Sequence, residues 1–324
     1  MSQYTKRTLK DEIFFNKINA AKKISLGTFP FKDLKEIQIF KIMERYLSSG
    51  RTFIDTAAFY GDRRVERILG RVLKDFNCEC FIATKVGYFR KKEEYQDQNY
   101  IYDQVQYSQE LIGQKINLLQ IHEADWDIWW LCDNGSLSYQ NMFNKAPVIK
   151  ALTKIKQNND TDYIGITGNN ADKLANIAHN LNCIDSVLLA KQYDLLWRNG
   201  RGKLRNVIEQ KNLFYIVGAP FHQGRLLNLD SLISENSHFD KEMAEEVEKL
   251  KSLIIKHGLN LIKTCLEFLL TDPLVDLILV GIKEENELWW LDYKLKHIPD
   301  EIYKELLSIG FIRNATKGIP YKIN

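Results

Sequence analysis

The sequence alternates short apolar segments with longer segments of helical periodicity, and this alternation constrains the fold more than any other feature. Apolar or β-branched runs typical of buried strands lie at 24–28, 52–55, 80–85, 117–122, 163–167, 186–191, 214–217 and 276–281. Apolar residues at helical spacing lie between them, at 34–47, 64–74, 101–113, 147–157, 171–180 and 202–210, then in segments reaching 271 and, after the last strand, about 307. Eight such strands, each followed by a helix, over roughly 250 residues predict an α/β fold of the (β/α)8 TIM barrel type.

A doubly wound parallel sheet is the competing fold. It would need a glycine-rich turn after an early strand to bind a dinucleotide, and the chain has no G-x-G-x-x-G. The segment 200–203 (Gly-Arg-Gly-Lys) lacks the first Gly and the final Ser/Thr of a P-loop and predicts a turn that opens a helix. With 45% hydrophobic residues among 324, the chain has ample core for one large domain. We therefore predict a single barrel domain over 1–324, with long loops at its C-terminal mouth.

Charge, cysteine content and hydropathy indicate a cytoplasmic protein that binds neither nucleic acid nor a membrane. The 45 basic and 42 acidic residues leave a formal charge of +3 and are dispersed along the chain. The five cysteines form no framework, and Cys78 and Cys80 have no second pair at zinc-ligand spacing, so no metal site is predicted. The N-terminus lacks an apolar signal segment, and charges and Pro273 interrupt the most apolar stretch, 259–282. The oligomeric state is left open.

Polar side chains stand at three neighbouring strand ends of the predicted barrel. Asp55 ends the second strand and Tyr60 follows it, Lys85 ends the third, and His122 ends the fourth. Because adjacent strand ends of a barrel lie side by side at one mouth, these residues should converge. Taken singly, a lysine after a strand is more often solvated, and a lone histidine is more often structural.

The combination of these four residue types suits proton transfer to a carbonyl group. A tyrosine has a pKa of about 10 and is a poor acid at neutral pH unless a nearby cation favours the phenolate. A buried lysine would supply that cation, an aspartate would hold the lysine, and a histidine would bind the carbonyl oxygen or relay a proton. No side chain supplies hydride, so a cofactor must do so.

Several segments, in order from about 24 to 288, resemble the aldo-keto reductase superfamily. They are Phe53-Ile-Asp-Thr-Ala-Ala-Phe-Tyr-Gly61 with 65–70, and then the shorter segments 83–85, 118–123, 164–170, 191–196 and 279–283. The resemblance implies that Asp55, Tyr60, Lys85 and His122 are the catalytic tetrad. Tyr60 would be the general acid in reduction and the base in oxidation, Lys85 would lower its pKa, Asp55 would pair with Lys85, and His122 would orient the carbonyl.

The same resemblance implies a nicotinamide cofactor and the residues that bind it. Thr167 with Asn169 or Asn170 matches the segment after the fifth strand that contacts the carboxamide, although the family usually has Ser-Asn there. Gly218, two residues before Pro220, stands where many relatives place an aromatic residue. The segment 218–227 more closely resembles the aldose and galactose dehydrogenase branch, which oxidises sugar lactols. The remaining positions implied for the cofactor are Gln192, Gly224, Leu226, Gly281, Lys283 and Glu284.

The segment after the eighth strand bears on the choice between NAD and NADP. Lys283 would suit a 2′-phosphate, but Glu284 takes a place often held by Ser. A carboxylate accepts from a free 2′-hydroxyl and repels a phosphate, which favours NAD weakly. The alternative is that the acidic residues only favour the start of the following helix.

A Trp-rich insertion follows His122 and extends to Ser136. Long loops at a barrel mouth commonly shape the substrate pocket, so Phe59, Trp126 and Trp129 are candidate substrate contacts. The alternative, favoured for at least one of Trp126, Trp129 and Trp130, is packing of the loop against the barrel. Trp289 and Trp290 are expected in the core, on a C-terminal helix.

We therefore expect an NAD(P)-dependent oxidoreductase that acts on a small-molecule aldehyde, ketone or sugar lactol. A second hypothesis is a regulatory subunit that keeps the fold and the cofactor site without turnover. A third is a barrel enzyme of unrelated chemistry, since the fold hosts many reactions.

Overall fold

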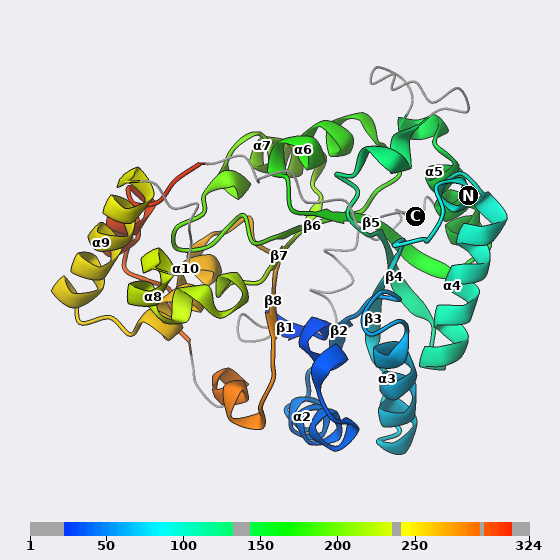
Figure 1. The fold of residues 1–324 in the computed structure, drawn as a ribbon, viewed down its shortest axis with the longest axis horizontal. Coiled ribbons are helices and arrows are strands. Elements are labelled where there is room, and N and C mark those ends of the chain that lie inside the picture. Colours follow the sequence, from blue (N-terminus) through cyan, green and yellow to red (C-terminus); the bar gives the residue numbers. More distant parts are fainter. Residues whose placement is uncertain (1–22, 132–142, 235–240, 292–294, 313–324) are drawn as a thin grey trace, which may run out of the picture.

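Eight parallel strands close into a barrel in strand order, with helices around it (Figure 1). The computed structural model describes residues 23–131, 143–234, 241–291 and 295–312. The strands are β1 (Ile24–Gly27), β2 (Phe53–Asp55), β3 (Phe81–Val86), β4 (Ile116–Ile121), β5 (Thr161–Gly168), β6 (Ser186–Ala190), β7 (Phe214–Gly218) and β8 (Leu277–Gly281). The predicted TIM barrel and its eight strands are confirmed.

The helices follow the strands as the periodicity predicts. Some begin at a side-chain cap: Asn170 accepts from the Lys173 amide at 3.0 Å and Asn260 from the Lys263 amide at 3.1 Å. The helices are α2 (Glu36–Ser48), α3 (Arg64–Asp75), α4 (Gln98–Ile112), α5 (Pro147–Gln157), α6 (Ala171–Asn180), α7 (Lys203–Lys211), α8 (Leu229–Ser234), α9 (Lys241–Lys256), α10 (Leu261–Thr271) and α11 (Asp300–Leu307). Among the described residues, no helix has the length and apolarity needed to cross a bilayer.

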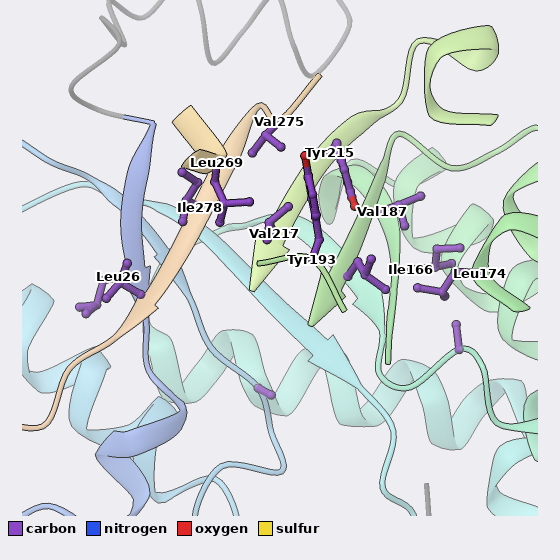
Figure 2. Close-up of a cluster of buried hydrophobic side chains, with 14 of the residues drawn as sticks. Leu26, Ile166, Leu174, Val187, Tyr193, Tyr215, Val217, Leu269, Val275 and Ile278 are labelled. Atoms are coloured by element: carbon purple, nitrogen blue, oxygen red, sulfur yellow. The ribbon is translucent and has the colours of Figure 1, made fainter. Parts of the chain in front are cut away.

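Strand pleating sorts the apolar residues into two cores. In β7, Tyr215 and Val217 face outward to the helices, whereas Phe214 and Ile216 face into the barrel. Figure 2 shows part of the outer core, where Val187, Tyr215 and Ile278 from three strands lie among helix side chains. The inner core closes the barrel below its mouth, so no channel runs through it.

Some sequence expectations need correction or lie outside the described residues. Trp289 and Trp290 belong to a 3-10 segment, η8 (Glu285–Leu291), not to an α-helix. Trp290 is in the core as expected, but Trp289 is only partly buried and lines the cavity at the barrel mouth. The N-terminal segment 1–22, Cys132 and the second half of the Trp-rich insertion, from 133 to 136, lie outside the described residues.

Candidate active site

Strand pleating also aims one residue from each strand into a cavity at the barrel mouth. In β3, Ala83 belongs to the inner core, so Lys85, two residues later, faces the same way. The same period of two operates in the other strands. The cavity measures about 850 Å³, and the strand-end residues that line it are Gly27, Asp55, Lys85, His122, Thr167, Ala190, Gly218 and Gly281.

These eight positions divide the mouth into a polar half and an open half. At these eight positions β2 to β5 place polar or ionisable side chains, whereas β6, β7, β8 and β1 place alanine or glycine; Leu188 and Leu279, one pleat earlier in β6 and β8, also line the cavity. Because β6 to β8 and β1 are neighbours in the barrel, the small residues leave one continuous space beside the polar groups. Any larger residue at Gly281 would meet the Pro30 ring, since a Cβ there would lie 2.8 Å from Pro30 Cγ.

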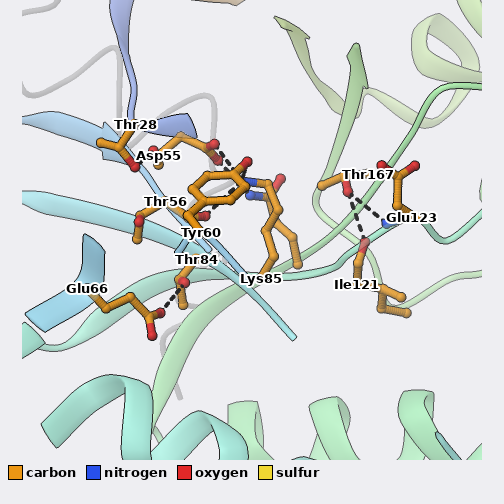
Figure 3. Close-up of polar contacts among 11 residues, drawn as sticks. Thr28, Asp55, Thr56, Tyr60, Glu66, Thr84, Lys85, Ile121, Glu123 and Thr167 are labelled. Atoms are coloured by element: carbon orange, nitrogen blue, oxygen red, sulfur yellow. Dashed lines mark hydrogen bonds and ion pairs between the residues drawn. The ribbon is translucent and has the colours of Figure 1, made fainter. Parts of the chain in front are cut away.

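Lys85 holds the polar half together (Figure 3). Its Nζ donates to Asp55 Oδ1 at 2.5 Å, to the Thr56 carbonyl oxygen at 2.7 Å and to the Tyr60 hydroxyl at 3.2 Å. Gln120 Nε2 donates to the second oxygen of Asp55 at 3.1 Å. All these polar groups are buried, so the ammonium and the carboxylate interact in surroundings of low dielectric. The expected convergence of Asp55, Tyr60 and Lys85 is therefore present.

The pKa of Tyr60 differs from the sequence-based expectation. Burial, and then the negative charges of Asp55 and Glu123, raise the pKa of Tyr60 well above 10. The net shift is opposite to the lowering expected from Lys85, because burial and the two carboxylates outweigh the effect of the ammonium, which lies closer to Asp55 than to the phenol. Tyr60 is therefore a phenol at neutral pH and can donate a proton.

His122 lies beside Tyr60, with the two ring centroids 5.9 Å apart. Burial, and then the positive charge of Lys85, hold the pKa of His122 well below its usual value, so the imidazole is neutral at pH 7. Within the described part of the chain its Nδ1 is buried without a hydrogen-bond partner. A neutral ring suits a hydrogen bond to a carbonyl oxygen without adding a second cation beside Lys85.

Glu66, which the sequence analysis did not single out, supports the strand that carries Lys85. It is fully buried on α3 and accepts from Thr84 Oγ1 at 2.7 Å (Figure 3). It also accepts from Ser108 Oγ at 3.1 Å, and Arg63 Nη1 lies 3.5 Å away. These contacts join α3, β3 and α4 below the site. The sequence feature that could have identified Glu66 was its position in the Val65-Glu-Arg segment.

The residues expected at the nicotinamide end divide into two groups. Thr167 and Asn169 at the end of β5 line the cavity, as do Gly218, Pro220 and Gly224 at the end of β7 and in the loop after it. Asn170, Gln192 and Leu226 are not among the lining residues. Asn170 caps α6, Leu226 is fully buried, and Gln192 Oε1 accepts from Asn199 Nδ2.

Lys191 takes the place expected of Gln192. Its φ of 63° breaks the strand period directly after β6, so Lys191 lines the cavity and the next residue turns away.

At the far end of the cavity the acidic residue is Glu287 rather than Glu284. Gly281, Lys283, Asn286 and Glu287 line this end, whereas Glu284 is exposed and outside the lining. Glu287 Oε2 accepts from the Lys283 amide at 2.6 Å, which fixes its carboxylate beside the turn after β8.

The aromatic residues that were predicted to contact the substrate also fall into two groups, those that line the cavity and those that do not. Phe59 lines the cavity and stacks on Tyr88 with ring centroids 3.7 Å apart. Trp129 is fully buried, packs beneath Gly87 and donates to the His122 carbonyl oxygen at 3.0 Å, so it holds the loop and does not contact a ligand. Trp126 packs edge-on against Tyr88 and is outside the lining. The alternative of loop packing is therefore confirmed for Trp129.

Sequence comparison decides the family. The model of the aldo/keto reductase family matches residues 23–289, which is most of the chain. The chain belongs to the aldo/keto reductase family. The matched segment contains all eight strands, both halves of the mouth and the Asp55–Lys85–Tyr60 contacts.

Two characterised proteins are distantly similar to this chain in sequence. Pyridoxal 4-dehydrogenase of Microbacterium luteolum is 21% identical over 331 residues, covering 89% of this chain and 94% of its own. An aldo-keto reductase of Gibberella moniliformis is 28% identical over 159 residues, which cover 48% of this chain and 44% of its own.

Solved structures share the fold of this aldo/keto reductase. The holo form of aldo-keto reductase AKR11C1 from Bacillus halodurans superposes with a TM-score of 0.71 at 18% identity, covering 91% of this chain and 94% of its own. Glycerol dehydrogenase AKR11B4 from Gluconobacter oxydans gives 0.66 at 18% identity, covering 88% and 90%. Family and fold together support an oxidoreductase that uses a nicotinamide cofactor and acts on a small-molecule carbonyl compound.

Proposed function

We propose that this aldo/keto reductase interconverts an aldehyde, ketone or sugar lactol with the corresponding alcohol or lactone, with Tyr60 as general acid in reduction and general base in oxidation. The observation that carries the proposal is the Lys85 ammonium, which contacts both Asp55 and the Tyr60 hydroxyl next to His122. The activities of a sequence relative, a pyridoxal 4-dehydrogenase, and of a structural neighbour, a glycerol dehydrogenase, agree with this reaction class.

The groups on the chain account for the proton transferred to or from the substrate, and Tyr60 exchanges its proton with solvent between turnovers. In reduction, the neutral His122 ring donates a hydrogen bond to the substrate oxygen, and the Tyr60 hydroxyl gives its proton to that oxygen as negative charge develops there. The phenolate left on Tyr60 is stabilised by Lys85 Nζ, 3.2 Å away, and Asp55 keeps that ammonium in place. In oxidation the Tyr60 phenolate removes the proton from the hydroxyl. Bound NAD(P)(H) supplies or accepts the hydride.

The open half of the mouth fits an extended cofactor. Gly27, Ala190, Gly218 and Gly281 leave room beside Tyr60, and the cavity continues to the charged end at Lys283 and Glu287. Thr167 and Asn169 would hold the carboxamide end, and the turn after β8 would hold the adenosine end.

A substrate panel tests the proposal. The purified protein, mixed with reduced cofactor and a set of aldehydes and ketones, or with oxidised cofactor and a set of sugars, should change absorbance at the nicotinamide band in at least one direction. A protein that binds the cofactor tightly and turns over no member of either set would contradict the proposal and favour the regulatory subunit.

We also propose that the enzyme prefers NAD, with Glu287 as the residue that rejects a 2′-phosphate. A carboxylate fixed beside the ribose accepts from a free 2′-hydroxyl and repels a phosphate. Glu287→Gln keeps an oxygen for the Lys283 amide but removes the charge, so kcat/KM with NADP should rise by about tenfold, which corresponds to about 1.4 kcal/mol. Glu284→Gln, the matched control outside the cavity, should change the NAD-to-NADP ratio much less.

The kinetic constants of the wild type and both variants with each cofactor provide the test. A wild type that prefers NADP, with no gain in either variant, would assign the adenosine end to Lys283 instead.

A further inference from the structure

Glu123 places a carboxylate in the cavity directly after His122. It lines the cavity together with Phe59, Tyr88 and Asn169. Its φ of 51° is unusual for a residue other than glycine, and Tyr88, which faces it from the loop after β3, has a φ of 59°. Two strained residues in contact at one site are typical of a functional constraint, because such strain persists only where the surroundings impose it.

The carboxylate of Glu123 is held in place by neutral donors. Oε2 accepts from Asn169 Nδ2 at 2.6 Å and Oε1 from the Tyr88 hydroxyl at 3.3 Å. Within the described residues it forms no ion pair, although the charge of Lys191, which also lines the cavity, acts on it. A carboxylate accepts about four hydrogen bonds, so these two contacts orient Glu123 and leave acceptor capacity on the same oxygens.

Together with the Glu123 carboxylate, the rings of Phe59 and Tyr88 form one corner of the cavity, with flat aromatic surfaces beside a polar group. Tyr88 stacks on Phe59 and packs edge-on against His122, with ring centroids 3.7 Å and 4.5 Å apart. Burial, and then Asp125, raise the pKa of Glu123 to about 7, whereas Lys191, Asn169 and Tyr88 oppose this rise. Above pH 7 the corner therefore presents negative charge beside the residue that binds the carbonyl.

We propose that Glu123, positioned by Tyr88 and Asn169, is an acceptor subsite for the hydroxyl groups of an uncharged, polyhydroxylated substrate, and that it excludes substrates carrying a carboxylate or phosphate. This inference rests on the proposed function, of which it names the substrate class. A fixed acceptor selects for hydroxyl groups because a substrate without them leaves part of the acceptor capacity of this half-buried carboxylate unsatisfied. An anionic group would meet the carboxylate at short range in a partly enclosed site, where repulsion is weakly screened.

The test compares neutral sugars with their uronates. Galactose and glucose are paired with galacturonate and glucuronate at pH 8, and butanal serves as a carbonyl substrate without hydroxyl groups. The wild type should favour the better neutral sugar over its uronate at least tenfold in kcat/KM. Glu123→Gln should reduce this preference at least fivefold, and its rate with butanal corrects for any general effect of the lost charge on proton transfer by Tyr60.

Two further variants separate charge from shape. Glu123→Asp keeps the negative charge but moves the carboxylate away from the substrate by one methylene. It should therefore still exclude the uronate, while kcat/KM for the neutral sugar falls. Glu209→Gln, which removes an exposed carboxylate on α7, should match the wild type throughout.

Each remaining outcome overturns a stated claim. Turnover of butanal without turnover of any sugar, an unchanged preference in Glu123→Gln, or a wild type that favours uronates through Lys191 would each overturn the subsite alone. A Glu123→Gln variant that alters only the KM of the cofactor would assign Glu123 to the cofactor site. Absence of turnover with every substrate would instead overturn the proposed function.

Discussion

Replacing Tyr60 with Phe should lower turnover by about 10²–10⁴-fold in both directions, the usual contribution of a general acid-base group. The variant removes one oxygen, and the ring keeps its edge-on contact with Phe29, whose centroid lies 5.2 Å away. Lys85 keeps its bonds to Asp55 and to the Thr56 carbonyl, so the site should retain its shape. Cofactor affinity, measured by fluorescence titration, should therefore survive while steady-state turnover collapses.

The pH profile gives a second measurement of the same role. Since burial raises the pKa of Tyr60, the phenolate needed for oxidation is scarce at neutral pH. Oxidation by the wild type should accelerate as pH rises, and the residual activity of Tyr60→Phe should lack this dependence. Tyr107→Phe, at an exposed position on α4, is the control for loss of a hydroxyl. Turnover of Tyr60→Phe close to that of the wild type would refute the assignment.

The barrel and its polar strand ends are predictable because they depend on regular periodicities. Apolar runs fix the strands, and a period of two then carries Phe53 to Asp55 and Ala83 to Lys85, from the inner core to the mouth. A residue that continues a strand in register can thus be placed from sequence.

The cavity lining is harder to predict just past the strand ends, where the backbone leaves that period. Positive φ occurs there at Tyr88, Glu123, Lys191 and Ala219. None of these residues is a glycine, which would have indicated the turn in the sequence. At Lys191 the turn exchanges the cavity position of Gln192 with its neighbour. Glu287 was missed for a related reason, since a tight turn after β8 brings it back to the Lys283 amide. These positions depend on tertiary contacts that local sequence does not encode.

Replacing Lys85 with Met should damage both activity and stability, because within the described part of the chain it removes the one cation that the buried Asp55 contacts. The side chains of both residues are almost fully buried, with Nζ and Oδ1 2.5 Å apart. Breaking such a pair from one side typically costs about 3–5 kcal/mol in the free energy of unfolding, since a charge is left buried without compensation. Turnover should also fall by at least about 10²-fold, because the phenolate formed on Tyr60 loses its electrostatic stabilisation.

A control on the surface separates this effect from the loss of any ion pair. Arg71 Nη2 lies 2.8 Å from Glu36 Oε2, but both side chains are substantially exposed. Arg71→Met should therefore change the unfolding free energy by less than about 1 kcal/mol and leave turnover unaffected. Chemical denaturation of both single variants supplies the comparison.

The double variant Asp55→Asn/Lys85→Met distinguishes the structural from the chemical role of the pair. Asn removes the stranded charge and keeps an oxygen for Gln120 Nε2, so much of the lost stability should return while turnover stays low. In Lys85→Met alone the deficit should shrink as pH falls, because burial already raises the pKa of Asp55 and protonation neutralises the carboxyl in the folded state. A double variant that regains turnover would mean that Lys85 acts on Asp55 only and has no role in proton transfer by Tyr60.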